Sequence, residues 1–360
     1  MQKQPKAKVK EAEKSGELGA DGSLALPGAW QLVDSLREEI DLYGCKVTIA
    51  GFAAKDGEEG PLATGSAASW TQDPRPLAGY ELFERMAILE ALAKPETHSW
   101  RLIDPQRGGS RGEVQGIFTS SPEPELWRAA RSNGVAIGNS WQQASQHALA
   151  EAVERHLVLA SWYGASRPER VRSEGEAGLP FSLQALARHF RLEHFSFGSL
   201  NTAGSKSPIF VSGSFLWPLK AEAPLVYGFG GGSSPAEALQ KSLKEAVQRL
   251  CFLDGAETPE SKPAFEPTAD FHQNYFLHPS RKQLLRRWLD GDFYRPGDEV
   301  LSQLLGGRRS VQFVDLTPAH LEQLFVVKVL SPHLLPLCFG RYRPASCPDL
   351  PEDRLIHPIV

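Results

Sequence analysis

Apolar and polar positions along this chain predict helices that alternate with strands. Apolar residues recur at helical spacing over 77–93, 140–160 and 235–252, and each of these stretches follows a segment rich in Gly and Ser. A further helix is predicted over 30–43, and the alternation over 46–50 predicts a strand. The folded part of the chain therefore opens with a helix and a strand, and three longer helices follow.

Three later runs are rich in β-branched and aromatic residues and read as strands: 208–217, 311–316 and 325–330. Proline and charge mark 254–272 as a loop, and the proline-rich segment 344–360 is not expected to be helical. Helices interleaved with strands predict a mixed α/β fold of the α+β kind.

The chain is predicted to form one large domain behind a short tail. Its 360 residues are 41% hydrophobic and 23% charged, as in an ordinary globular protein. Residues 1–25 hold almost no large apolar side chains, so we expect a flexible tail there and a folded domain over 26–360. Residues 344–360 form that domain's proline-rich C-terminal tail.

The charge balance argues against several classes of partner. A net charge of −4 provides no basic surface for nucleic acid or an anionic membrane. No continuous apolar stretch is long enough to span a bilayer, so we expect a cytoplasmic protein. The four cysteines lack paired spacing, which predicts reduced thiols and not a zinc site or a disulfide framework.

A short motif recurs on the three longer helices: a small residue, two positions, Glu, two positions, Glu or Gln, then Arg. Its copies run over 78–85, 148–155 and 242–249. The second and third copies also share their upstream loop, since Gly138 and Gly232 each lie 13 residues before the first Glu (151 − 138 and 245 − 232). The first copy matches only over its core.

This repeat places acidic side chains in pairs. Residues three apart on a helix project from nearly the same face, so the two carboxylates of a copy repel one another unless a cation joins them. If the helices converge, they form an oxygen-only cluster suited to magnesium, which in turn suits a polyphosphate ligand. The predicted metal ligands are Glu81, Glu84, Glu151, Glu154, Glu245 and Gln248.

The arginine that ends each copy lies four residues after the first Glu. For a single copy, this spacing is typical of a surface ion pair on a solvated helix. Three copies at homologous helix positions favour a shared site instead, in which Arg85, Arg155 and Arg249 orient carboxylates or bind phosphate. The chain contains no GxxxxGK[ST] sequence, so a nucleotide site must be built without a P-loop.

These residues resemble a known family. The segment 132–140 followed by the 151–155 motif, and Gly230-Gly231-Gly232 followed by the 245–249 motif, resemble the signature of YcaO-domain proteins. The segments 314–317, 327–332 and 336–340 are similar to the C-terminal half of that family, in the same order. The resemblance covers roughly residues 40–360.

The resemblance implies an ATP site in which the acidic helices hold Mg²⁺ ions that bind the phosphates. By motif, the six predicted ligands form the metal shell, the three arginines support it or touch phosphate, and Ser132 and Asn133 contact the nucleotide. The family uses ATP to phosphorylate the oxygen of a peptide backbone amide after a nucleophile adds to its carbonyl. The product is an azoline from Cys, Ser or Thr, a thioamide or an amidine, depending on the nucleophile.

The C-terminal tail favours the azoline product. Azoline formers in the family often end in a proline-rich tail whose terminal carboxylate approaches the active site, and 353–360 looks like a reduced version. The resemblance therefore gives His357, Pro358 and Val360 catalytic roles, and disorder is the alternative for this tail. Two positions depart from the family pattern: Ala78 replaces a frequent Ser, and Gln143 lies where a Glu is frequent.

The resemblance also implies partners. The substrate would be a ribosomal precursor peptide, delivered by a separate E1-like or leader-binding protein, because residues 1–120 are too short for an appended recognition domain as well as the first motif. A homodimer is left open. A non-catalytic scaffold with the same fold, and a stand-alone accessory role for an ATP-dependent member of the family, are the competing interpretations.

Overall fold

The computed structural model describes residues 24, 26–171, 179–203, 205, 207–220, 223–253, 255, 259, 261–291, 296–305 and 309–360. Apart from residue 24, the tail predicted for 1–25 lies outside the described residues. The described helices are α1 (Arg75–Leu92), α2 (Trp141–Trp162), α3 (Pro235–Leu253), α4 (Ala269–Leu277), α5 (Lys282–Asp290) and α6 (Asp298–Leu305). Short 3₁₀ segments span Phe181–Arg188, Pro279–Arg281 and Glu352–Arg354.

The described strands form four sheets, and the named strands within each pair antiparallel. The first has the order β1 (Trp30–Leu42), β2 (Cys45–Asp56), β3 (Leu62–Ser69). The second has the order β11 (Val226–Gly232), β10 (Ile209–Pro218), β9 (Phe190–Leu200), β8 (Glu169–Val171). The third has the order β5 (Ser110–Val114), β4 (Trp100–Ile103), β12 (Gln312–Asp315), β13 (Phe325–Leu330), β7 (Val135–Gly138), and β14 (Cys338–Gly340) pairs with β6 (Trp127–Ala129).

The mixed α/β fold predicted from the hydrophobic pattern is confirmed. The three long helices match α1, α2 and α3, and the strands predicted at 46–50, 208–217, 311–316 and 325–330 match β2, β10, β12 and β13. The predicted loop at 254–272 ends earlier than expected, because α4 begins at Ala269, where Thr268 Oγ1 accepts a hydrogen bond from Phe271 N at 3.1 Å.

The helix predicted over 30–43 is wrong, because this segment is strand β1. Tyr43 and Gly44 both have positive φ, at 53° and 84°, and so form the tight two-residue turn that joins antiparallel strands. The Asp41 carboxylate accepts a hydrogen bond from Gly44 N at 2.7 Å and fixes the turn. Pairing with the whole length of β2 therefore overrides the helical spacing of Leu32, Leu36 and Ile40 in β1.

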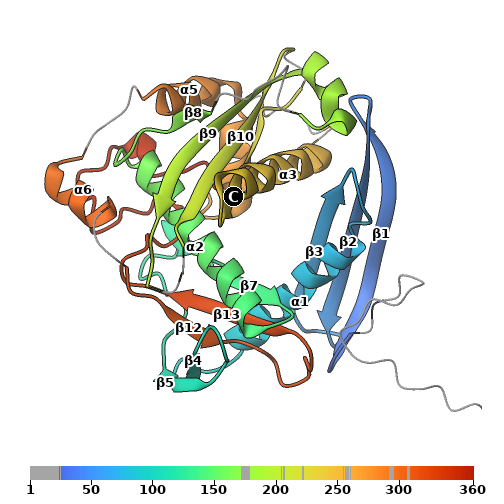
Figure 1. The fold of residues 1–360 in the computed structure, drawn as a ribbon, viewed down its shortest axis with the longest axis vertical. Coiled ribbons are helices and arrows are strands. Elements are labelled where there is room, and N and C mark those ends of the chain that lie inside the picture. Colours follow the sequence, from blue (N-terminus) through green and yellow to red (C-terminus); the bar gives the residue numbers. More distant parts are fainter. Residues whose placement is uncertain are drawn as a thin grey trace, which may run out of the picture.

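Each acidic helix is the centre of its own packed core. One core gathers around α1, β2 and β3, the second around α2, β9 and β10, and the third around α3 with β11. Each helix packs on the strand that precedes it in the chain and also contacts the strand of the next unit: α1 reaches β7, α2 reaches β11 and α3 reaches β3. Figure 1 shows α2 running through the middle of the molecule, with α1 and α3 on either side.

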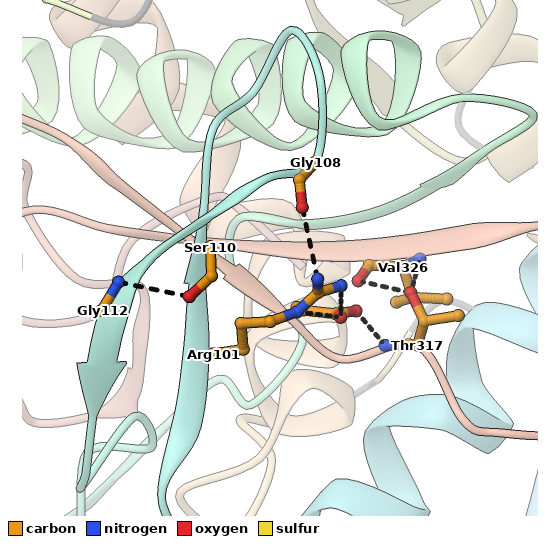
Figure 2. A network of polar contacts seen from close by, with 7 residues as sticks. Arg101, Gly108, Ser110, Gly112, Thr317 and Val326 are labelled. Atoms are coloured by element: carbon orange, nitrogen blue, oxygen red, sulfur yellow. Dashed lines mark hydrogen bonds and ion pairs between the residues drawn. The ribbon is translucent and has the colours of Figure 1, made fainter.

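A polar network ties β4 to the strands that carry part of the site (Figure 2). Arg101 donates from Nε to Asp315 Oδ2 at 3.1 Å and from Nη1 to the Gly108 carbonyl at 3.3 Å. The other oxygen of Asp315 accepts from Thr317 N at 2.9 Å, and Thr317 Oγ1 accepts from Val326 N at 3.0 Å. The network therefore fixes β13 beside β12.

Two further expectations can be compared with the described residues. All four cysteines are free thiols, as the spacing predicted, and three of them are buried. No helix among the described residues is both long and apolar enough to cross a membrane.

Candidate active site

The first carboxylate of every copy is held by the strand that precedes its helix. In each case a backbone N–H of that strand, or of the residue just before it, donates to the Glu side chain. The three bonds are Ser66 N to Glu81 Oε2 at 3.0 Å, Gly134 N to Glu151 Oε1 at 3.2 Å and Phe229 N to Glu245 Oε2 at 3.3 Å. The strand thus fixes where the carboxylate points.

Glycine allows each helix to lie directly on its strand. A Cβ at Gly65 would meet the Ala78 carbonyl oxygen at 2.2 Å, and one at Gly228 would meet Ala246 N at 2.4 Å. A Cβ at Gly138 would likewise meet Ala144 N at 2.7 Å. Side chains at these glycines would push the helices away from the backbone groups that orient the carboxylates. Gly65 therefore permits the close contact between strand and helix in the first copy, as Gly138 and Gly228 do in the second and third copies.

The second acidic position of each copy reaches the strand of the next unit. Burial raises the pKa of both Glu84 and Glu154, and backbone hydrogen bonds from Ile137 and Gly231, respectively, offset part of that rise. The third copy closes the ring, because Gln248 Nε2 donates to the carbonyl of Ser66 in β3 at 3.3 Å. The three helices are therefore linked in a cycle, and the six predicted metal ligands belong to one connected region.

These carboxylates perturb one another. Burial raises the pKa of Glu151 to about 7, and repulsion from Glu154 adds to the rise. Burial also raises the pKa of Glu245 to about 7, again with repulsion from Glu154. Burial raises the pKa of Glu84 well above its ordinary range, and the charges of Glu151 and Glu81 contribute. Without a bound cation the cluster therefore resists full ionisation, and a divalent cation would relieve this repulsion.

The three motif arginines differ in their surroundings. Arg85 pairs with Glu81 of its own helix at 3.4 Å and is exposed. Arg155 lies 3.8 Å from Glu154, and its Nε and Nη1 are buried without a hydrogen-bond partner. Arg249 donates to the Tyr227 carbonyl at 3.2 Å, and one of its nitrogens, Nε, is buried without a hydrogen-bond partner, against two in Arg155. Arg155 is thus the motif arginine best placed to bind a further anion.

The predicted nucleotide contacts lie in the loop before β7. Asn133 Oδ1 is buried and has no hydrogen-bond partner, while the backbone carbonyl of Asn133 accepts from Lys328 Nζ at 2.9 Å. Sequence reasoning missed Lys328, which comes from β13 and belongs to no repeat. The available signals were its place between apolar residues in the middle of a strand, where lysine is rarely buried, and its position inside the family-like segment 327–332.

A cavity of about 1430 Å³ opens beside these residues. It is lined by one face of α1, by the segment before β7 and by part of β14. Arg85 and Ser132, both predicted to touch the nucleotide, lie in this lining. Phe339 also lines it, and the Phe339 ring lies 5.9 Å from the His357 ring. The cavity therefore adjoins both the first motif and the C-terminal segment.

The C-terminal tail is ordered and buried, so the alternative of disorder is wrong for its described residues. His357, Pro358 and Ile359 are buried, and Val360 is half-buried. His357 Nε2 donates to the Cys338 carbonyl at 2.9 Å. Burial lowers the pKa of His357 to about 4, and the positive charge of Arg155 contributes. The tail thus lies beside the second acidic helix, and Figure 1 shows the chain ending within the body of the molecule.

Both departures from the family pattern leave the carboxylates in place. Ala78 is fully buried where α1 meets β3, and Gln143 Oε1 accepts from Asn139 N at 2.9 Å near the start of α2. Tyr80 of α1 donates to Asn139 Oδ1 at 3.2 Å, so these two residues join the first and second helices.

Within the described part of the chain, no three His, Cys, Asp or Glu side chains stand close enough to form a preformed metal cluster. The donors present are carboxylate and amide oxygens, which suit Mg²⁺, an ion that usually keeps water and phosphate oxygens in its shell. The raised carboxyl pKa values and the unpartnered donors of Arg155 fit a magnesium-bound polyphosphate. The assignment of the six ligands stays a prediction.

Comparison with known proteins points to one family. The family described as YcaO cyclodehydratase, ATP- and Mg²⁺-binding, matches residues 114–335. The fold is similar to YcaO from Methanopyrus kandleri bound with AMPPCP and Mg²⁺, with a TM-score of 0.55 and 20% identity over 83% of this chain and 85% of that one. It is also similar to a chain of the E. coli microcin synthetase McbBCD complex with pro-MccB17 bound, with a TM-score of 0.55 and 15% identity over 93% and 98% of the two chains. No curated protein matches the sequence.

Proposed function

The chain belongs to the YcaO family, and from that premise we propose that it cyclises Cys, Ser or Thr residues of a ribosomally made peptide to azolines. Its cofactors are ATP and Mg²⁺, as the family description states. ATP supplies the phosphoryl group that converts the amide oxygen into a leaving group. Overall, one side-chain nucleophile replaces that oxygen, one water is lost from the peptide, and ATP becomes ADP and phosphate.

At the nucleotide, the oxygen ligands would bind Mg²⁺ and an arginine would bind a phosphate oxygen. The ligands for Mg²⁺ would be Glu81, Glu84, Glu151, Glu154, Glu245 and Gln248. Arg155 has buried donors without hydrogen-bond partners, which suit the charge of a phosphate oxygen. Arg85 and Ser132 line the adjoining cavity, where they suit the remaining part of the nucleotide or the peptide.

The buried tail is the observation that favours azoline formation over the other products. A nucleophilic side chain must lose a proton as it adds to the amide carbon, so a base near the peptide is required. The tail places His357 near enough to Arg155 of the second acidic helix for the arginine charge to help lower the pKa of the histidine, and a carboxylate carried by Val360 would be the base. His357 and Pro358 would hold that carboxylate in place, since both are buried.

The same cavity supports a peptide substrate. It touches Arg85 on one side and Phe339, which packs against the tail, on another. A peptide amide lying there would have the nucleotide site and the tail as neighbours. A partner protein of the E1-like or leader-binding kind would deliver the peptide, as a separate subunit.

The decisive experiment measures peptide mass after incubation with ATP, Mg²⁺, a partner protein and a peptide rich in Cys, Ser and Thr. Loss of one water for each ADP formed is the expected result. In a parallel incubation that also contains sulfide as the nucleophile, exchange of oxygen for sulfur would establish a thioamide product instead. Binding of Mg²⁺ and AMPPCP with no ATP turnover and no mass change would favour the non-catalytic scaffold. The Glu151→Gln variant is the matched control, because it removes one predicted metal ligand and keeps the side-chain volume.

A further inference from the structure

Lys328 is a buried cation of the site that does not come from an acidic helix. Only 6% of the residue is exposed, and it lies on β13, between β12 and β7. Its Nζ donates to the Asn133 carbonyl at 2.9 Å and lies 5.3 Å from the centre of the Phe118 ring. The Glu151 carboxylate is close enough that the two charges stabilise one another.

β13 holds the loop before β7 at two successive carbonyl groups. The Lys328 side chain binds the carbonyl of Asn133, and the backbone N–H of Val329 donates to the carbonyl of Gly134 at 2.8 Å. The N–H of Gly134 donates to Glu151 Oε1 at 3.2 Å. Lys328, the Asn133–Gly134 loop and Glu151 therefore all interact with one another, so displacement of one would displace the other two.

The loop fixed in this way presents an unmatched acceptor. Asn133 Oδ1 is buried and has no hydrogen-bond partner. A buried acceptor without a partner is destabilising, so a donor on a bound ligand would complete this loop. Phosphate oxygens are themselves acceptors, whereas the ribose hydroxyls and the adenine amino group are donors.

We propose that Lys328 is a positioning residue of the nucleotide site, which fixes the Asn133–Gly134 loop so that Asn133 Oδ1 accepts a hydrogen bond from the nucleoside part of ATP. This inference rests on the proposed use of ATP and deepens it. The acidic helices then bind the magnesium and phosphates, and the loop held by β13 recognises the nucleoside. A lysine that only balanced the charge of Glu151 would affect all polyphosphate ligands alike.

The experiment compares two probes, Mg²⁺–AMPPCP and Mg²⁺–tripolyphosphate, by calorimetric titration of the full chain. The tripolyphosphate carries the three linked phosphates of the nucleotide without its nucleoside. The ratio of the two affinities therefore cancels effects on the metal and phosphates. For Lys328→Met, which keeps the length of the side chain, and for Asn133→Ala, we expect this ratio to fall by about fivefold to tenfold.

Coupling between the two residues provides a second readout. If Lys328 acts through the loop, its effect and that of Asn133 are not additive. The affinity ratio of the K328M/N133A double variant should therefore be no lower than that of either single variant. Lys46→Met is the matched control, since Lys46 lies on the exposed hairpin near Glu39 and Asp41, and its ratio should stay unchanged. Should K328M fail to fold, K328Q takes its place, because glutamine is too short to reach the carbonyl at the same distance.

The outcomes separate this inference from the proposed function. A wild-type chain that binds neither probe overturns the use of ATP. A wild-type chain that binds Mg²⁺–AMPPCP, with an unchanged ratio in the lysine variant, overturns only the role of Lys328. Equal weakening of both probes also overturns it, because that pattern belongs to a lysine that acts on charge or folding alone.

Discussion

Gln248 of α3 donates a hydrogen bond to the carbonyl of Ser66 in β3, at 3.3 Å. The N–H of the same Ser66 donates to Glu81 of α1 at 3.0 Å. One residue at the end of the first sheet therefore joins the first and third copies of the acidic motif. The other junctions, between Glu84 and Glu151 and between Glu154 and Glu245, bring carboxylates near each other instead.

This difference explains why the third copy carries an amide where the others carry a second carboxylate. A carboxylate has no proton to donate, so it would repel the Ser66 carbonyl, whereas the amide of Gln248 bonds to it. The ring of three helices is thus closed by protein at one junction. At the other two, carboxylates raise one another's pKa, and the predicted Mg²⁺ would relieve that repulsion.

The closing bond gives a first prediction. Gln248→Glu removes the donor and sets a negative charge against a carbonyl, so unfolding without Mg²⁺ should cost about 1–3 kcal/mol less than in the wild type at pH 8. Thermal and urea unfolding measure this difference. Gln146→Glu, at an exposed position of α2, is the control and should change stability little. Equal stability of Q248E and the wild type would show that the bond to Ser66 contributes nothing.

The crowded carboxylates predict how stability depends on pH in the absence of Mg²⁺. The folded-state pKa values of Glu151 and Glu245 are about 7, against an ordinary value of 4.5. Between these values the native state binds more protons than the unfolded state, so their contribution to stability falls as pH rises from about 4.5 to 7 and then levels off. Urea unfolding at several pH values, with the E151Q/E245Q variant as reference, isolates this contribution.

In that comparison, the variant should gain stability relative to the wild type across the same pH range, because it keeps an uncharged group at both positions. Mg²⁺ should abolish the gain by stabilising the ionised carboxylates of the wild type. A stability difference that does not change with pH would contradict the assignment of the raised pKa values to these two residues.

The sequence predicted the acidic helices well, because each follows from local spacing and an upstream glycine. It failed at β1, where Leu32, Leu36 and Ile40 recur at helical spacing but the Tyr43–Gly44 turn pairs the segment with β2. It also failed to find Lys328. A residue that reaches the site from β13 has no periodic neighbour to reveal it, and only the pairing of β13 with β7 brings it to Asn133.

The first copy of the motif looked poorest in sequence because its upstream glycine is displaced and prolines intervene. In the structure, Gly65 nevertheless performs the expected close approach, at 2.2 Å from the Ala78 carbonyl oxygen for an added Cβ. Register between a strand and the helix after it depends on the length of the turn that joins them, and this length is not fixed by the motif. The spacing between the upstream glycine and the first Glu is therefore a poor guide to whether a copy of the motif packs on its strand.

Gly65→Ala tests that conclusion. The added methyl would overlap the backbone of α1, so we expect a loss of stability of about 1–3 kcal/mol. The Ser66 N–H would also move away from Glu81, so affinity for Mg²⁺–AMPPCP should fall as well. Gly109→Ala is the control, because nothing lies within 4 Å of the added Cβ there. Wild-type stability and affinity in G65A would mean that α1 does not depend on close contact with β3.

His272 anchors the tail and gives a fourth prediction. Its Nε2 accepts from Gly340 N at 2.8 Å, which leaves the proton on Nδ1, where it donates to the His357 carbonyl at 2.9 Å. His272→Phe removes both bonds, so the last residues should become accessible to a carboxypeptidase, measured as loss of C-terminal residues by mass. His333→Phe, at an exposed position, should leave the tail protected. Equal protection in both variants would contradict the anchoring role.

Shortening the chain by Val360 alone is the sharpest test of the tail's chemistry. Ile359 is 1% exposed within the core around α2, so deleting both last residues would remove packing as well as the carboxylate. Val360 is half-buried, and its deletion moves the terminal carboxylate by one residue while Ile359 keeps its place. If that carboxylate serves as the base, ADP formation with peptide and partner should drop by about 10²-fold or more.

Thermal stability and Mg²⁺–AMPPCP affinity of this shortened variant should stay close to those of the wild type. Adding one glycine after Val360 should lower turnover in the same way. Full turnover in both variants would leave the tail with a purely structural role, because a base displaced in either direction loses its hydrogen-bond reach to the nucleophile.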